Sequence, residues 1–108
     1  SSIDGVITIS AGDADSAAIG IQQANASNKV KLGSFDLNKA GLDRIKGGKQ
    51  AFAIDQQPYL QGYLAASLLA AHIDFGTNLP TFPVLTGPGI VDSSNIDATL
   101  NGVAKGAR

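Results

Sequence analysis

Residues 51–63 read AFAIDQQPYLQGY. The apolar start of this stretch is typical of a buried strand, and Pro58 fits the first turn of a helix, where its missing N–H costs nothing. Asp55, Gln56 and Gln57 lie between these two elements. Carboxamides donate and accept hydrogen bonds without carrying charge. Two of them at a strand end therefore suit a neutral, hydroxyl-rich ligand.

Strand-like and helix-like segments alternate along the rest of the chain. The expected strands are 6–10, 30–35, 51–54 and 81–86, and the expected helices are 16–26, 39–46, 58–71 and 95–104. Short alternating units predict the α/β class, with a parallel sheet, right-handed crossovers and flanking helices. The helix at 58–71 is apolar around most of its circumference, which predicts heavy burial.

Helix starts in this chain carry polar residues that can cap them. Asp13 or Asp15 is the expected N-cap of the first helix, and Asn38 that of the second. Gly47 and Gly48 are expected to end the second helix in a left-handed turn. Ser94 or Asn95 is the expected cap of the last helix.

The composition excludes several classes of function. The chain has 108 residues and a formal net charge of −1, which argues against nucleic acid or an anionic membrane as a partner. It contains no cysteine, so disulfides, thiolate metal sites and a cysteine nucleophile are excluded. The apolar run at 64–73 is too short to be inserted in a membrane. His72 is the single histidine, which favours a structural role over metal binding, and we expect no cofactor.

Hydrogen-bonding residues gather where the predicted strands end. In an open parallel sheet, ligands bind outside the carboxyl ends of the strands. Asp13 more readily serves as a helix cap than as a ligand residue, whereas Asp36 is open to either role because Asn38 can cap the next helix. Phe35 and Tyr59 are placed to pack on the apolar face of a sugar ring. The rim consists of Ser10 with Asp13, then Asp36, then Asp55 with Gln56 and Gln57.

Catalytic readings of these residues are weak. Asp36 and Asp55 could form a glycosidase pair, but nothing beside them distinguishes an acid from a base. No serine has the Gly-x-Ser-x-Gly setting of a nucleophile elbow. We therefore expect a binding protein and not an enzyme.

Two motifs carry a family resemblance. Residues 33–37 read GSFDL, and residues 45–63 read IKGGKQAFAIDQQPYLQGY. Together they resemble the type I periplasmic sugar-binding proteins of ABC importers, which are similar to ribose-binding proteins. The Phe-Asp element alone is weak, whereas the run from Asp55 to Tyr63 at its distance from that element is specific. Motif agreement covers 3–63, and the pattern continues to about residue 92.

The resemblance implies roles for individual residues. Asp36 matches the aspartate that accepts hydrogen bonds from sugar hydroxyls, and Gln56 matches a glutamine that also binds sugar. The family's Asn-Asp pair after the first strand aligns with Ala14-Asp15, so that asparagine is absent here. Asp13 is a possible substitute for it. Gln57 is a further candidate ligand residue, although its position favours the hinge and the helix start.

The resemblance also implies a partial, two-lobed architecture. Residues 1–57 would form a βαβαβ segment of the C-terminal lobe, 58–92 would cross to the other lobe, and 93–108 would be a tail or return segment. The chain then corresponds to the C-terminal portion of a longer protein. A missing N-terminal part or a companion fragment would cover the sheet edges and the helix at 59–71.

The implied function is binding of a sugar or polyol by hinge closure, for delivery to an ABC permease. The implied location is the periplasm, or outside the cell after secretion from a bacterium. The alternative is the effector-sensing domain of a lactose-repressor-like transcription regulator, which shares the fold. A helix-turn-helix encoded upstream would favour the regulator, and a signal peptide would favour the importer.

Overall fold

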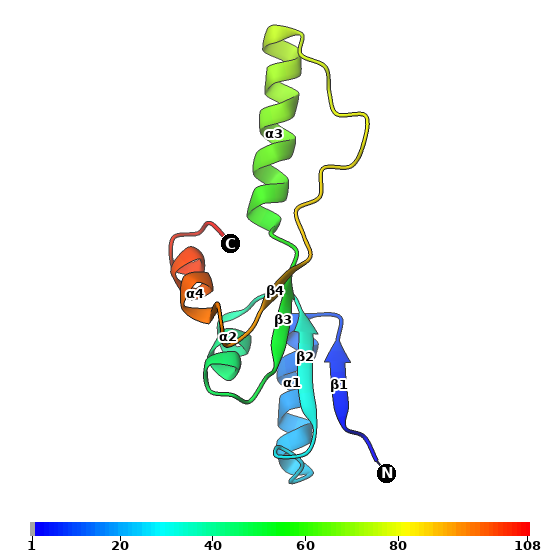
Figure 1. Ribbon diagram of the computed structural model, residues 1–108, viewed down its shortest axis with the longest axis vertical. Coiled ribbons are helices and arrows are strands. Elements are labelled where there is room, and N and C mark those ends of the chain that lie inside the picture. The colour runs from blue at the N-terminus through cyan, green and yellow to red at the C-terminus, as the bar shows by residue number, and fades with distance from the viewer. Residues whose placement is uncertain (1) are drawn as a thin grey trace.

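The computed structural model, which describes residues 2–108, has a four-stranded sheet in the order β1-β2-β3-β4, with helices beside it (Figure 1). The predicted α/β class is therefore confirmed. The elements are β1 (Gly5–Thr8), α1 (Ala11–Gln23), β2 (Lys31–Phe35), α2 (Lys39–Lys46), β3 (Phe52–Asp55), α3 (Pro58–Phe75), β4 (Gly89–Val91) and α4 (Ile96–Ala104).

The first three strands are parallel, as predicted, and one face of the sheet carries the core. Side chains alternate between the two faces of a strand, so Ala53 and its partner Val91 point to the same face. The neighbouring pair, Ile54 and Ile90, points to the opposite face, where Ile90 is 49% exposed. The buried apolar cluster consists of Leu42, Ile45, Ala53, Val91 and Ile96.

The prediction for the fourth strand was wrong in position and direction. Residues 81–86 contain no strand, and β4 lies at Gly89–Val91, antiparallel to β3. The reason is the course of the chain after β3. Helix α3 extends beyond the carboxyl end of β3, and the return segment comes back to that same end (Figure 1). β4 therefore enters the sheet from the end at which β3 leaves it.

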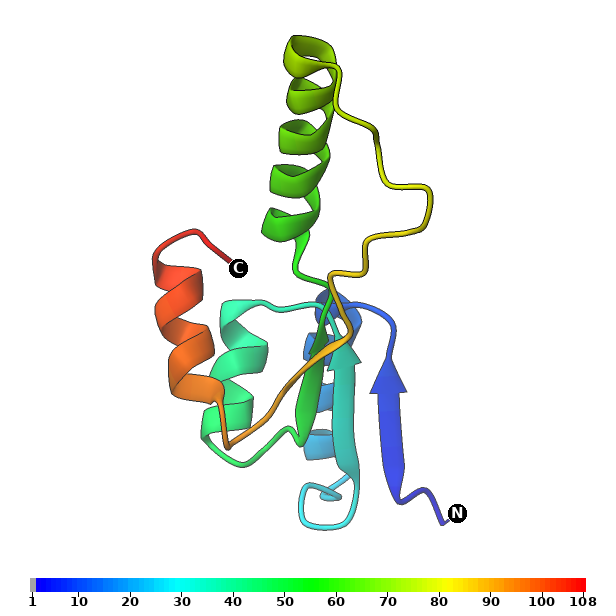
Figure 2. The same cartoon turned by 45° about the horizontal axis from the view of Figure 1, so that its top comes forward.

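Helix α3 is exposed along its whole length, so the prediction of heavy burial was wrong for this chain. None of its residues is buried, and Leu69 and Ile73 are 53% and 70% exposed. Both views show the helix standing apart from the sheet and the other helices (Figure 2). The radius of gyration is 17.5 Å, whereas a compact domain of this length has about 13 Å. The apolar circumference of α3 has nothing in residues 2–108 to pack against.

Helix caps agree with the sequence only in part. Ser10 caps α1, because its Oγ accepts from the N–H of Asp13 at 3.0 Å; neither Asp13 nor Asp15 is the cap. The helix begins at Ala11 and includes both aspartates. Asn38 caps α2 as predicted, and its Oδ1 accepts from the N–H of Gly41 at 2.6 Å. Asn95 precedes α4 without a side-chain cap bond.

A polar network connects α1 and α2 with β2 and with the start of β3. Asp15 forms an ion pair with Arg44 at 2.6 Å, without hydrogen-bond geometry, and accepts from Asn38 Nδ2 at 3.0 Å. Arg44 Nε donates to Gln50 Oε1 at 3.1 Å. Gln50 Nε2 in turn donates to Ser34 Oγ at 2.9 Å, and both residues are buried. This network fixes the two strands whose ends carry the candidate site.

Candidate functional site

Asp36 and Gln56 meet at the carboxyl edge of the sheet. β2 and β3 are parallel neighbours, and Asp36 follows the first while Gln56 follows the second. The Asp36 N–H donates to the carbonyl of Ile54 at 2.9 Å, which extends the strand pairing by one residue. Gln56 Nε2 then donates to Asp36 Oδ1 at 2.6 Å. The two residues expected to bind ligand are therefore adjacent, with Asp36 half-buried and Gln56 exposed.

Both strand ends turn through unusual backbone conformations. Asp36 has φ of 65° and Gln57 has φ of 56°, which are left-handed values. Aspartate tolerates this region better than most residues, whereas a glutamine there is strained. These turns end each strand abruptly and set the direction in which Asp36 and Gln56 leave the sheet.

Gln57 ties together two segments that pass each other at the start of α3. Its Nε2 donates to the carbonyl of Thr86, and its backbone N–H donates to Asp55 Oδ1 at 2.8 Å. Thr86 Oγ1 donates to the carbonyl of Gln56 at 3.0 Å, and Gln61 Nε2 donates to that same carbonyl at 2.7 Å. The side chain of Gln57 is thus held in this junction and does not point toward Asp36.

Asp13 is not hydrogen-bonded to this pair in the described part of the chain. Its backbone N–H bonds to the Ser10 cap, and its side chain is exposed in the first turn of α1. Within residues 2–108 it forms no side-chain hydrogen bond to Asp36 or Gln56. Ala14, at the position where the family pattern has asparagine, is fully buried and offers only a methyl group.

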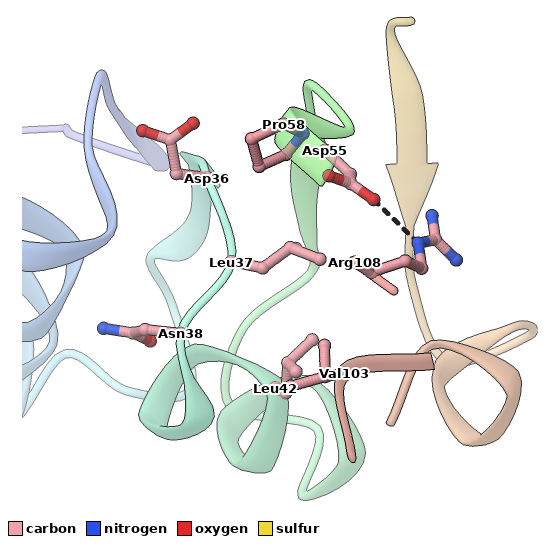
Figure 3. Close-up of a pocket in the computed structure, with 8 residues that line it drawn as sticks. All are labelled: Asp36, Leu37, Asn38, Leu42, Asp55, Pro58, Val103 and Arg108. Carbon is pink, nitrogen blue, oxygen red and sulfur yellow. Dashed lines mark hydrogen bonds and ion pairs between the residues drawn. The ribbon is translucent and has the colours of Figure 1, made fainter. Parts of the chain in front are cut away.

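Asp55 is turned away from the rim, although the sequence groups it with the other polar residues there. It is 1% exposed, and its Oδ2 accepts from Arg108 Nε at 2.8 Å (Figure 3). Tyr59, a candidate for ring stacking, lies parallel to Tyr63 with ring centroids 6.3 Å apart. It is 54% exposed on α3.

Two pockets adjoin the Asp36–Gln56 pair. The first has a volume of about 360 Å³ and lies between the ends of β2 and β3, α2 and α4 (Figure 3). The second has about 350 Å³ and is lined by Phe35, Ile54, Gln56 and the return segment at 84–88. Asp36 borders the first and Gln56 the second. The first pocket is lined by Asp36, Leu37, Asn38, Leu42, Asp55, Pro58, Val103 and Arg108.

Residues 2–108 hold no cluster of three or more histidine, cysteine or acidic side chains that could bind a metal ion. His72 lies near the end of α3, with Nδ1 at 2.7 Å from the carbonyl of Thr77.

None of the helices described within 2–108 has the length and apolar character needed to cross a membrane.

No sequence pattern indicates the contacts that Arg108 and Thr86 make at the site. Thr86 lies in the segment 81–86, for which the sequence predicts a strand, and that prediction does not imply its contacts with Gln56 and Gln57. Arg108 is 53 positions from Asp55 in the chain. No local pattern signals such a contact.

Comparisons of the sequence with known proteins find similarity to periplasmic and sugar-binding proteins. A family model described as a periplasmic binding protein domain matches residues 1–78. The xylose/arabinose-binding protein XylF of Sulfolobus acidocaldarius is 32% identical over 81 residues, covering 75% of this chain and 20% of that protein. This chain therefore spans about a fifth of that relative.

Solved structures with a similar fold include a carbohydrate transporter and a putative transcription regulator. A carbohydrate transporter from Acidothermus cellulolyticus, in complex with myo-inositol, superposes with a TM-score of 0.85 at 36% identity, covering 98% of this chain and 37% of that one. A putative LacI transcriptional regulator from Bacteroides fragilis gives a TM-score of 0.73 at 25% identity, covering 88% and 32%. The chain spans roughly a third of each solved structure.

Proposed function

The chain belongs to the periplasmic binding protein family, and we propose that it contributes Asp36 and Gln56 to a sugar- or polyol-binding site. The protein would be the solute-binding component of an ABC importer, working with a permease in the periplasm or outside the cell. The observation that carries the proposal is the contact between Gln56 Nε2 and Asp36 Oδ1 at the rim of the sheet.

The chemistry of this pair suits hydroxyl groups. A carboxylate accepts hydrogen bonds from two hydroxyls at once, and a carboxamide both donates and accepts. A hydroxyl placed between Asp36 and Gln56 donates to the first and accepts from the second. It thereby replaces their mutual hydrogen bond without leaving either group unsatisfied. No charge transfer or bond cleavage is needed, so the proposed role is binding and not catalysis.

The proposed hinge closure rests on where the chain leaves the sheet. Residues 1–57 would belong to one lobe, the chain would cross to the other lobe from residue 58, and it would be back in the first lobe at β4, which pairs with β3. Two arguments support this division. Gln56 directly precedes the junction made with Thr86, and α3 exposes an apolar surface that a second lobe would bury. Ligand contacts made to both lobes at once would favour the closed form.

The missing N-terminal part of the protein, or a companion fragment, would supply the rest of the site. The relatives are longer than this chain by a large margin, since it covers 37% of the Acidothermus structure. Aromatic side chains that stack on the sugar ring would come from that part.

Calorimetric titration of the full-length protein tests the proposal. The panel should include myo-inositol, xylose and arabinose, because these compounds are named with the relatives. Asp36→Ala should weaken binding by about 2 kcal/mol, roughly thirtyfold in Kd. The matched control is Asp43→Ala, which removes an exposed carboxylate on α2 and should leave the affinity unchanged. Absence of binding to every sugar and polyol would overturn the proposal.

The second candidate is an effector-sensing domain of a transcription regulator. The similarity to the putative LacI regulator favours it. Sequencing the gene upstream of this segment distinguishes the two: a DNA-binding helix-turn-helix supports the regulator, and a secretion signal supports the importer.

A further inference from the structure

Asp55 is a buried carboxylate at the end of the strand that carries Gln56. It is 1% exposed, and β3 turns its side chain to the same face as Ala53, toward the core. A charge in this position is costly unless it is paired and hydrogen-bonded. Both of its oxygens have partners, and each partner restrains a different part of the site.

One oxygen of the Asp55 carboxylate restrains the backbone of Gln57, the residue after Gln56. Asp55 Oδ1 accepts from the N–H of Gln57 at 2.8 Å, and Gln57 is the residue with left-handed φ of 56°. The Asp55 carboxylate thus restrains the backbone of Gln57. The backbone of Gln56, which lies between them, is therefore restrained. Its carbonyl is also held, by Thr86 Oγ1 at 3.0 Å.

The other oxygen is held by a cation. Asp55 Oδ2 accepts from Arg108 Nε at 2.8 Å (Figure 3). Arg108 Nη1 donates to Thr99 Oγ1 at 3.1 Å. Thr99 is fully buried on α4. The guanidinium therefore joins the end of β3 to α4 and keeps the carboxylate in one rotamer.

We propose that Asp55 and Arg108 are positioning residues that aim the Gln56 side chain at Asp36. This inference rests on the proposed function for its meaning, but its geometry concerns only this chain. The carboxylate fixes the turn at Gln57, the guanidinium fixes the carboxylate, and Gln56 Nε2 is delivered to 2.6 Å from Asp36 Oδ1. In this proposal Asp55 and Arg108 act through Gln56 and not through direct contact with the ligand.

A purely structural role makes a different prediction. Replacing both members of a buried ion pair with apolar residues of similar size is often neutral or stabilising, whereas removing one member is destabilising. A structural pair can therefore be replaced by Asp55→Leu with Arg108→Met at no cost to the site. A positioning pair cannot, because leucine accepts no hydrogen bond from Gln57.

The test is made on the full-length protein, by NMR of the Gln56 side-chain amide in sugar-free solution. The signal is assigned by its loss in Gln56→Ala, and Asp36→Ala gives the reference position without the acceptor. In Arg108→Gln and in the double variant, the signal should move toward that reference. The double variant should nevertheless melt near the wild-type temperature, so its result holds even where Arg108→Gln fails to fold.

Sugar titration provides the second readout. Both variants should bind about tenfold more weakly, as expected for loss of one charge-assisted hydrogen bond. Arg108→Lys, which keeps the charge, should recover part of this loss. The matched control is Lys46→Gln, which breaks the exposed Lys46–Asp97 pair at 2.8 Å between α2 and α4 and should change neither readout.

A Gln56 signal that stays at its wild-type position in the double variant would overturn the inference and leave a structural pair only. The two proposals fail separately. A wild-type protein that binds no sugar removes the proposed function, while the amide signal still decides whether Asp55 and Arg108 orient Gln56.

Discussion

Gln56 and Asp36 are hydrogen-bonded to each other at 2.6 Å although they lie 20 positions apart in the chain. Each is the first residue after a parallel strand, and the two strands are neighbours. Acceptor and donor are thus held in register by the sheet itself. Their energetic contributions to ligand binding should be coupled for the same reason.

A double-mutant cycle measures that coupling. Asp36→Ala and Gln56→Ala should each weaken sugar binding, and the double variant should lose less than the sum by about 1 kcal/mol, because each single change also removes the partner's hydrogen bond. Calorimetric Kd values for the four proteins give the coupling directly. Strict additivity would mean that the two side chains act independently on the ligand.

Gln57→Ala should affect stability more than affinity. Its amide bonds to the carbonyl of Thr86, so its removal loosens the junction without touching Asp36. We expect the melting temperature to fall while the sugar Kd stays within about threefold of wild type. Gln61→Ala, which also removes a bond to the junction, is the comparison. An affinity loss as large as that of Gln56→Ala would instead place Gln57 among the ligand residues.

Gln50→Leu should destabilise the fold beneath the site. Gln50 is buried, donates to Ser34 Oγ and accepts from Arg44 Nε. A leucine leaves both partners unsatisfied, at a cost of about 2 kcal/mol. Urea unfolding measures the difference in free energy of unfolding. The control is Gln23→Leu at the exposed end of α1, which should change that free energy little.

Asp92 should make the start of α4 sensitive to acid. Hydrogen bonds from the Ser94 hydroxyl, and then from the Ser94 N–H, lower the pKa of Asp92 from its usual value of 3.8. A lowered pKa in the folded state contributes stability above the unfolded value, and that contribution is lost as pH falls through the folded value. Melting temperatures recorded from pH 6 downward should therefore fall less steeply in Asp92→Asn. Asp74→Asn, at the exposed end of α3, should retain the wild-type profile.

The proximity of Asp36 to Gln56 could be predicted from the sequence because it depends on local facts. Two adjacent β-rich segments, joined by a short helix, form neighbouring parallel strands whose ends coincide. The cap at Asn38 was predictable for the same reason, since its partner is three residues away.

The remaining features depend on contacts that no local pattern encodes. The apolar surface of α3 predicted burial, but burial needs a partner surface that residues 2–108 do not provide. The direction of β4 depends on where the return segment meets the sheet. The position of Ser10 as the cap shows a milder error: Ser10, Asp13 and Asp15 lie close together in the sequence and each could start α1, and the earliest one does.

The junction at Gln57 and Thr86 has a mechanical consequence. If these two segments are the crossings between lobes, their hydrogen bonds would make them bend together, and the axis of the proposed closure would pass beside Gln56. A group near a pivot sweeps through a short arc. Asp36 and Gln56 would then move little during closure and form the stationary side of the binding site. They would determine how fast a sugar associates, whereas the residues of the other, moving lobe would determine how fast it dissociates.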